Sequence, residues 1–267
     1  MLSSTVRGRF CCAALLAGAL ALSGCTSSVS TGLLPAGGVD YQLGTPYAPP
    51  NGTAIVARDR LAQPASGVFS ICYVNAFQTQ PGELGDWPAD ALLRSGGEIV
   101  YDPDWPDEAL LDLGEAGVRR LVVERVGGWI EDCGDAGFDA VELDNLDSFT
   151  RSGGAFDVDA AVQTAAGLAE IAHESGLLIG QKNAAEYSAR MHDEAGFDFA
   201  VAEECAAFEE CAAYTDVYGE NLIDIEYPDT LDDFDAACAA EVLPDRAVLR
   251  DRLLVGPDEK GYLLERC

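Results

Sequence analysis

The chain has 267 residues, of which 16 are Lys or Arg and 46 are Asp or Glu, so its formal net charge is −30. Hydrophobic residues make up 48% of the chain and charged residues 23%, which excludes a protein that is disordered throughout and fits one large domain or two small ones. The charge argues against nucleic acid as a partner, because binding phosphates requires Lys and Arg. A solubilising acidic surface is its simplest explanation, and a cationic, polyamine-like substrate would also be attracted.

The first 25 residues are typical of an export signal rather than of a folded domain. Arg7 and Arg9 precede an apolar run over residues 11–22, which is too short to span a membrane. The tetrad LSGC, which ends at Cys25, resembles a bacterial lipobox, in which the cysteine is lipidated and becomes the new N-terminus. Cleavage nearby by an ordinary signal peptidase is the alternative.

These features predict a lipoprotein signal peptide over residues 1–24, a polar tether over 25–38 and one domain over 39–267. The mature protein would then be exported and face outward from the cell membrane, which it would contact only through the lipid on Cys25. We expect it to be a monomer.

The cysteines agree with export, because an even number remains after the signal peptide and Cys25 are set aside, and this predicts disulfides. Cys205 and Cys211 bracket a short loop and are predicted to pair. The other pairings stay open; one arrangement joins Cys238 to Cys267 and Cys72 to Cys133. The absence of a C-x-x-C pair and the presence of only two His argue against zinc, so no metal and no cofactor are expected.

Runs rich in β-formers alternate with helical stretches along the domain. Apolar residues at helical spacing predict helices over 115–136 and 157–174. The predicted strands are 39–43, 53–59, 68–77, 109–113, 140–145, 177–183, 199–205 and 221–227. Strands that alternate with helices indicate a parallel sheet, and eight of them fit an α/β fold of the (β/α)8 TIM-barrel type. A doubly wound sheet is the runner-up, although no G-x-G-x-x-G or Walker loop supports it.

Polar residues, mostly acidic, end many of these strands, and the carboxyl ends of barrel strands meet on one face. The set comprises Asp59, Asp112, Glu142, Asp144, Lys182, Asn183, Glu203, Glu204, Asp224 and Glu226. Alternation predicts that Glu142 and Asp144 face inward, and that Asp224 and Glu226 do the same. A helix N-cap explains single acids. It does not explain acids at five strand ends, which predict an acidic pocket.

Two carboxylates across a cleft are the machinery of glycoside hydrolysis, in which one protonates the leaving oxygen and the other attacks the sugar or activates water. Other hydrolytic chemistries lack their signatures, since no G-x-S-x-G elbow and no cluster of His occurs. Aromatic residues near strand ends, among them Tyr73, could stack on sugar rings.

At these residues the sequence resembles glycoside hydrolase family 114, the endo-α-1,4-polygalactosaminidase family. The similar segments are 40–44, 71–83, 137–149, 176–183, 197–211 and 223–227, in the expected order. The resemblance implies a (β/α)8 barrel that cleaves α-1,4-linked galactosamine polymers, with retention of configuration. It implies that Asp144 of the E-x-D-N tetrad is the nucleophile and that Glu203, in the position of the Glu of N-E-Q-C, is the acid/base.

The second motif departs from the family pattern, since it reads A-E-E-C with Ala202 and Glu204. If Phe199 and Val201 face the helices, alternation places Glu204 inward instead of Glu203. A bulge would restore Glu203, so we take Glu203 as the acid/base and keep Glu204 as the alternative. The neighbouring charge of Glu204 is expected to raise the pKa of Glu203, as an acid catalyst requires.

A galactosamine polymer without acetyl groups is polycationic, so the acidic charge and the resemblance agree. Candidate ammonium-binding residues are Asp59, Asp112, Glu142 and Glu226. Lys182 would be out of place beside an ammonium and is expected to pair with a carboxylate and keep it ionised. A non-catalytic carbohydrate-binding lipoprotein on the same barrel is the rival interpretation, because a fold does not fix a function.

Overall fold

The computed structural model describes residues 34–267. The predicted signal peptide, Cys25 and most of the predicted tether lie outside the described residues. None of the helices in the described part is long and apolar enough to cross a membrane.

Eight parallel strands form the wall of a nearly closed barrel. In spatial order they are β1 (Gly38–Gln42), β2 (Thr53–Asp59), β3 (Phe69–Asn75), β6 (Ala140–Asp144), β7 (Leu178–Lys182), β8 (Phe199–Glu203), β9 (Leu222–Glu226) and β10 (Ala247–Arg250). A final strand, β11 (Leu264–Arg266), pairs antiparallel with β10. The barrel-type α/β fold expected from the sequence is therefore confirmed.

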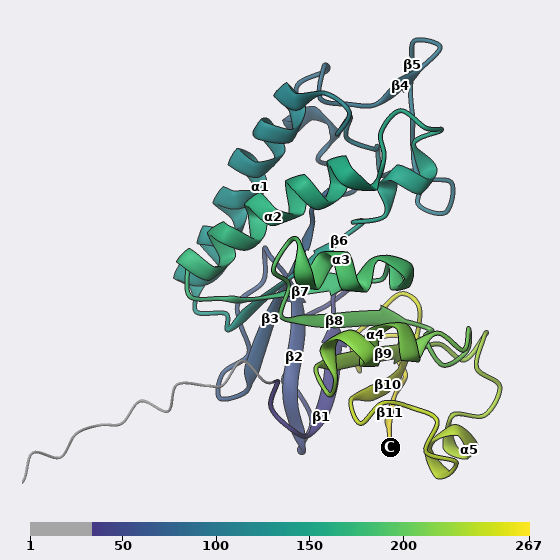
Figure 1. The fold of residues 1–267 in the computed structure, drawn as a ribbon. Helices are drawn as coiled ribbons and strands as arrows, with labels where there is room; N and C mark the ends of the chain where they lie inside the picture. The colour runs from purple at the N-terminus through teal and green to yellow at the C-terminus, as the bar shows by residue number, and fades with distance from the viewer. Residues whose placement is uncertain (1–33) are drawn as a thin grey trace, which may run out of the picture. The chain divides into compact units, whose positions relative to one another are not determined.

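Helices follow the strands from β3 onward. They are α1 (Ala116–Ala136), α2 (Val158–Glu174), α3 (Ser188–Asp193), α4 (Cys211–Tyr218) and α5 (Phe234–Ala239). The described part of the chain also has three 3-10 turns: η1 (Leu84–Asp86), η2 (Ser148–Arg151) and η3 (Ala185–Tyr187). Figure 1 shows α1 and α2 side by side on one flank of the barrel. Within residues 34–267, no helix separates β1 from β2 or β2 from β3, so this side of the barrel has no helical cover.

The helix boundaries follow from local sequence. The side chain of Asp157 caps α2 by accepting a hydrogen bond from the amide of Ala160, and Gly137, at φ 93°, ends α1 in a left-handed conformation. The predicted helices over 115–136 and 157–174 thus agree with the structure to within one residue at each end.

Alternate residues of the strands fill the barrel interior. The interior cluster includes Val39, Tyr41, Ile55, Ile71, Ala140, Phe199, Val201, Ile223, Ile225 and Val248. Gly180 of β7 also faces this cluster, and a Cβ there would lie 2.3 Å from the ring of Phe199, so glycine makes room for that ring. Residues of the opposite parity, such as Val141 and Leu143, pack against the helices in a second cluster.

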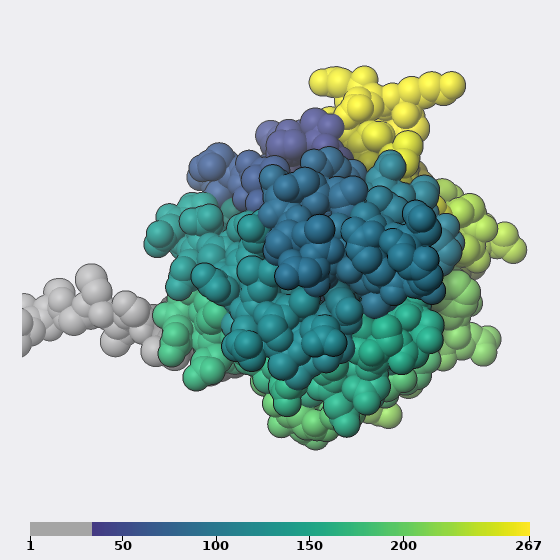
Figure 2. Space-filling view, turned by 90° about the horizontal axis from the view of Figure 1, so that it is seen from above, coloured from purple at the N-terminus to yellow at the C-terminus, as the bar shows by residue number. Residues whose placement is uncertain are grey.

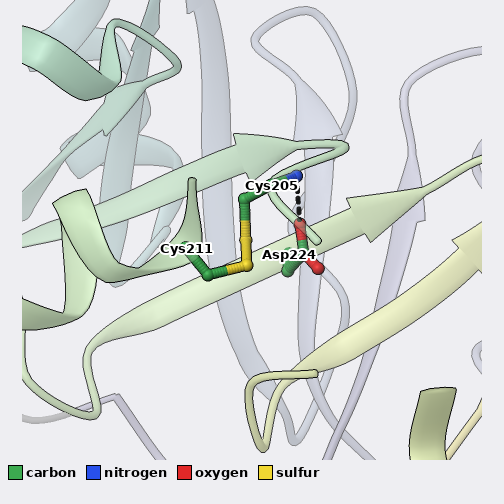
Figure 3. Close-up of side chains that lie close together, drawn as sticks. All are labelled: Cys205, Cys211 and Asp224. Atoms are coloured by element: carbon green, nitrogen blue, oxygen red, sulfur yellow. Dashed lines mark hydrogen bonds between the residues drawn. A yellow bond between two sulfur atoms is a disulfide. The ribbon is translucent and has the colours of Figure 1, made fainter. Parts of the chain in front are cut away.

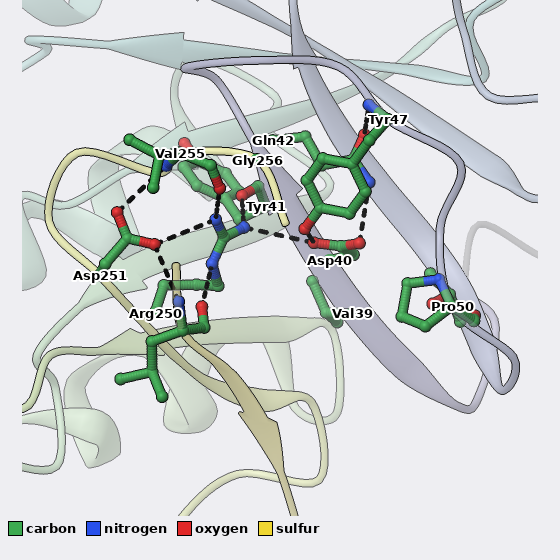
Figure 4. A network of polar contacts seen from close by, with 12 residues as sticks. Val39, Asp40, Tyr41, Gln42, Tyr47, Pro50, Arg250, Asp251, Val255 and Gly256 are labelled. Carbon is green, nitrogen blue, oxygen red and sulfur yellow. Dashed lines mark hydrogen bonds and ion pairs between the residues drawn. The ribbon is translucent and has the colours of Figure 1, made fainter. Parts of the chain in front are cut away.

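A seam between β10 and β1 is closed by side chains, because these two strands form no backbone ladder in the described part. Arg250 is fully buried there. Its guanidinium donates to Asp40 Oδ1 at 3.3 Å, to the carbonyl of Tyr41, and to the carbonyl of Val255 at 3.0 Å (Figure 4). Tyr47 donates to the same oxygen of Asp40 at 2.7 Å. Hydrogen bonds of the buried guanidinium therefore connect β10 and β1 where strand pairing is absent.

The predicted strand over 109–113 was wrong, and β10 was missed. Residues 109–111 are buried but form only isolated bridges, within an irregular segment that connects β3 to α1 and carries the hairpin of β4 (Arg94–Ser95) and β5 (Glu98–Ile99). Figure 2 shows this segment, in blue, spread over the middle of the surface that faces the viewer. An apolar run indicates burial without indicating a strand, and β10 has only four residues.

Within residues 34–267, three disulfides join Cys72 to Cys133, Cys205 to Cys211 and Cys238 to Cys267. The predicted Cys205–Cys211 pair is among them. The first disulfide ties β3 to α1, and the third joins α5 to the C-terminal residue.

Candidate active site

The carboxyl ends of the parallel strands open into a cleft of about 530 Å³. Its floor is formed by residues at the strand ends: Tyr41, Asp59, Tyr73, Asp144, Lys182 and Glu203. One side comes from the irregular segment between β3 and α1, which contributes Asp102, Asp104, Trp105 and Glu108. Another side comes from the segment after β10, which contributes Arg252, Leu253 and Leu254.

Asp144 ends β6 and faces the cleft, with both carboxylate oxygens held by donors. Tyr73 donates its hydroxyl to Oδ2 at 2.8 Å, and the amide of Asn145 donates to Oδ1 at 2.7 Å. Asn145 adopts a positive φ of 62°, which Asn tolerates better than most residues, and its side chain donates to Asn75 Oδ1 at 2.9 Å. The turn after β6 therefore fixes the orientation of the carboxylate.

Glu203 ends β8 and faces the same cleft. Tyr227 donates its hydroxyl to Oε1 at 2.5 Å, and Asn183 donates its side-chain amide to Oε2 at 2.9 Å. Burial by itself would raise the pKa of Glu203, but the charge of Lys182 and these hydrogen bonds outweigh burial and lower the pKa below its ordinary value. Glu203 is thus ionised near neutral pH in the unliganded protein.

Lys182 joins the two carboxylates. Its Nζ lies 3.1 Å from Glu203 Oε2 and 3.6 Å from Asp144 Oδ2. Those two oxygens are therefore no farther apart than the sum of the two distances, about 6.7 Å. Burial lowers the pKa of Lys182, but the surrounding carboxylates outweigh it and raise the pKa above its usual range, so the amine stays cationic.

Glu142 lies deeper in the barrel than the cleft-lining residues. It is fully buried, accepts a hydrogen bond from the Tyr41 hydroxyl at 2.5 Å and has its Oε1 3.7 Å from Lys182 Nζ. Burial raises its pKa to about 7 despite Lys182 and Tyr41, which lower it. Glu142 faces inward as predicted, but it is not among the residues that line the cleft, so its expected contact with substrate is not supported.

The other predicted substrate-binding residues fall into two groups. Asp59, Tyr73 and Lys182 line the cleft. Asp112, Glu204 and Glu226 do not belong to its lining. The predicted strand that was to present Asp112 is absent, and its Oδ1 instead accepts the amide of Gly114 at 3.2 Å in the turn before α1.

The assumption that Phe199 and Val201 of β8 face the helices was wrong, and no bulge is needed to turn Glu203 into the barrel. Phe199 and Val201 fill the barrel interior, so ordinary alternation turns Glu203 inward as well. Glu204 has a positive φ of 65° and pairs with Arg252 at 2.7 Å. The expected rise in the pKa of Glu203 from its neighbour is therefore also wrong, because Arg252 pairs with that neighbour, and Lys182 and the hydrogen bonds together lower the pKa of Glu203 despite its burial.

The prediction that Asp224 and Glu226 face inward was wrong for the same reason, since Ile223 and Ile225 occupy the interior. Asp224 Oδ1 instead accepts the amide of Cys205 at 3.2 Å, beside the disulfide (Figure 3). Glu226 Oε1 accepts the amides of Ala206 at 2.9 Å and Ala207 at 3.3 Å. The two acids thus hold the loop that follows the Glu203 strand.

The same loop contains a close group of residues of metal-ligating types. In the described part of the chain, the one close group of potential ligands is Cys205, Cys211 and Asp224. Because the two sulfurs are bonded to each other, this group offers no thiolate.

Sequence reasoning missed several polar residues of the site. Asn145 was among them, and Asn183 was named only as a strand-end residue without a role. Both directly follow strand-end charged residues, and an Asn at such a position is a usable signal for a turn with positive φ. Glu108 and Arg252 gave no signal, because they lie in irregular segments that the barrel pattern does not place.

Comparison with known proteins agrees with this geometry. Residues 25–267 match the model of glycoside-hydrolase family GH114. No curated protein matches the chain in a search of such proteins. The crystal structure of Ega3 from Aspergillus fumigatus in complex with galactosamine is similar, with a TM-score of 0.66 and 21% identity over 88% of this chain and 97% of that one.

The glycoside hydrolase domain of PelA from Pseudomonas aeruginosa is also similar, with a TM-score of 0.55 and 16% identity over 84% of this chain and 97% of that domain. At these identities the two structures support the barrel fold. The family match covers nearly the whole chain, including both strand ends that carry the carboxylates. The chain therefore belongs to glycoside-hydrolase family GH114 and is a glycoside hydrolase.

Proposed function

We propose that the protein cleaves α-1,4-linked galactosamine polymers by a retaining mechanism, with Asp144 as nucleophile and Glu203 as acid/base. The observation that carries this proposal is the pair of carboxylates joined by Lys182 on the floor of the cleft. Retaining enzymes place their carboxyl groups about 5–5.5 Å apart, and inverting enzymes about 6.5–9.5 Å apart. The upper limit of about 6.7 Å between Asp144 Oδ2 and Glu203 Oε2 leaves the two carboxylates close enough for the retaining arrangement.

Each residue has a defined part in the reaction. Asp144 forms a bond to the anomeric carbon while the bond to the leaving oxygen breaks, and Glu203 gives that oxygen its proton. Glu203 then removes a proton from water, which attacks the same carbon and releases Asp144. Tyr73 orients the nucleophile, while Tyr227 and Asn183 orient the acid/base.

The first step requires a proton on Glu203, whose pKa is lowered in the unliganded protein. The protonated fraction of Glu203 grows as the pH falls, so kcat/KM is expected to rise from neutral toward acidic pH.

The substrate assignment is supported by charge and by a structural relative. The chain carries a net charge of −30, which attracts a polycation, and Ega3 was crystallised in complex with galactosamine. Acidic residues also line one side of the cleft, including Asp102, Asp104 and Glu108.

The proposal is tested by incubating the protein with galactosaminan and partly acetylated oligomers and identifying products by mass spectrometry. Proton NMR of the first product formed reports its anomeric configuration, and the α-anomer is expected. An initial β-anomer would contradict retention. Binding of the polymer without any product would favour the rival carbohydrate-binding function.

We also propose that the protein is exported and held at the membrane through a lipid on Cys25. The support is the LSGC tetrad at the end of a short apolar run. Cys25→Ala is expected to release a soluble protein or to leave the precursor uncleaved. Unchanged membrane association of this variant would contradict the anchor.

A further inference from the structure

Glu108 is a buried carboxyl group on the wall of the cleft, in the irregular segment between β3 and α1. The residue is 9% exposed and belongs to the cleft lining. Its Oε2 accepts a hydrogen bond from the side-chain amide of Asn75 at 2.8 Å, and the amide of Asn145 lies 3.5 Å from the same oxygen. Its other oxygen, Oε1, forms no hydrogen bond with any residue of the described part.

The charges around Glu108 leave it without a cationic partner. Asp144 on β6 and Asp102 on the same irregular segment are close enough to disfavour its charge. Arg151 of η2 is the nearby cation, but it pairs with Asp102 at 2.8 Å and with Asp147 at 2.9 Å. Burial and the two acids therefore raise the pKa of Glu108 to about 7, against the lowering effects of Asn75 and Arg151.

The position of Glu108 is fixed relative to the proposed nucleophile. Asn75 and Asp144 are direct neighbours in the β3–β6 ladder, and Asn145 follows Asp144 in the chain. Both Asn side chains lie at Glu108 Oε2, which leaves Oε1, on a residue that lines the cleft together with Asp144, without a bond to the described part of the chain. The anomeric carbon that Asp144 attacks has two neighbours in the sugar ring. One is the ring oxygen, which carries no hydrogen, and the other is C2. A carboxylate needs a donor, and in galactosamine C2 carries an ammonium.

We propose that Glu108 binds the C2 ammonium of the sugar attacked by Asp144 and thereby makes the cleft select free-amine sugars over N-acetylated ones. This inference rests on the proposed function, because it takes the sugar to sit at Asp144. An acetamide at C2 carries no charge and offers a single N–H, so it leaves the buried carboxylate without its counter-ion. Glu108 therefore replaces Asp112, Glu142 and Glu226 as the ammonium ligand expected from the sequence.

Calorimetric titration with galactosamine and with N-acetylgalactosamine tests this directly, in two buffers of different ionisation enthalpy near pH 7. The ammonium favours ionised Glu108, so its pKa falls and galactosamine binding should release protons to the buffer. N-acetylgalactosamine should release far fewer. In Glu108→Gln, the affinity for galactosamine should fall about tenfold or more and the proton release should shrink, while the affinity for N-acetylgalactosamine changes less than about threefold.

Glu98→Gln is the matched control, because Glu98 is exposed on the hairpin of the same irregular segment, and it should behave as the wild type. The inference is overturned if the wild type binds both sugars equally or neither, or if Glu108→Gln weakens both sugars alike. If the variant fails to fold, the preference of the wild type for galactosamine and its proton release on binding still test the proposal. Polymer cleavage by the wild type is measured separately: selective binding without cleavage counts against the proposed function alone, and cleavage without selectivity counts against Glu108 alone.

Discussion

Two pairs of acids with the same spacing in the sequence lie on opposite faces of the barrel sheet. Glu142 and Asp144 of β6 face inward, where Lys182 lies within 3.7 Å of one and 3.6 Å of the other. Asp224 and Glu226 of β9 face outward and have no cation within salt-bridge distance in residues 34–267. They bind backbone amides of the loop after β8 instead. An acid that alternates with apolar residues on a strand therefore joins the reactive cluster if its face of the sheet points into the barrel. It binds backbone amides of a loop if its face points outward.

The difference extends to protonation. The inward cluster, which Glu203 completes, contains a buried lysine, and Lys182 lowers the pKa of Glu203. In the outward pair, burial raises the pKa of both carboxyls, and the charge of Glu226 adds to the rise at Asp224. Asp224 Oδ2 and Glu226 Oε2 are buried without a hydrogen-bond partner in the described part. The buried cation thus helps to lower the pKa of Glu203, whereas burial without a cation raises the pKa of Asp224 and Glu226.

Amide substitutions should separate the two faces most strongly. Asp144→Asn and Glu203→Gln preserve shape and remove the chemistry, so each should lower kcat at least about 1,000-fold while substrate binding stays largely intact. Asp224→Asn changes only the contact of Asp224 with the loop after β8, so it should lower kcat less than about tenfold. Steady-state kinetics on galactosamine oligomers measure this. Equal losses on both faces would contradict the division of roles.

Lys182→Met removes the buried cation that distinguishes the inward cluster and should change the pH dependence of kcat/KM. Without Lys182, burial dominates at Glu203 and its pKa rises, so the fall of kcat/KM on the alkaline side should begin at a higher pH than in the wild type. The maximal rate should fall about tenfold or more, because Asp144 loses the same partner. Lys260→Met, at the exposed second lysine, is the control. A pH profile of kcat/KM that keeps its position would show that Lys182 does not control the protonation of Glu203.

The outward pair predicts a pH dependence of stability with a definite sign. A carboxyl whose pKa is raised in the folded state binds more protons in the folded protein than in the unfolded one. The contribution of Asp224 and Glu226 to the free energy of unfolding is therefore fully present below the ordinary carboxyl pKa. It is lost as the pH rises through their raised pKa values. Removing one such group in Asp224→Asn should reduce the loss of Tm between pH 5 and pH 8 by at least about 2–4 °C, which corresponds to about 1 kcal/mol.

Calorimetric scans of the wild type and Asp224→Asn at several pH values measure this effect. A steeper loss of Tm in the variant than in the wild type would mean that the pair is ionised in the folded protein.

Glu204→Gln should have the smallest effect. Glu204 is not part of the cleft lining and pairs with Arg252, whose side chain is 43% exposed, and partly exposed pairs of this kind contribute about 0–1 kcal/mol. We expect less than about a threefold change in kcat/KM with galactosamine oligomers. An inactive Glu204→Gln together with an active Glu203→Gln would reverse the assignment of the acid/base.

Much of the fold was predictable because the signals were local. The spacing of Val118, Val122 and Val126 predicted α1, and their burial confirms the face. The failures were not local. The apolar residues of 109–113 are buried within an irregular segment, and the short β10 closes the barrel through Arg250 and Asp40, two residues separated by nearly the whole domain.

The sequence by itself determined that acids end several of the strands and that a barrel brings strand ends together, because hydrophobic periodicity is a property of consecutive residues. It also determined that Glu142 and Asp144 share a face. Only the tertiary structure decided that this face, and not that of Asp224 and Glu226, is the inner one, since both faces of a parallel barrel strand are apolar and buried. It also decided that Glu108, from an irregular segment, completes the cleft, because that placement depends on contacts with Asn75 and Asn145 rather than on a sequence period.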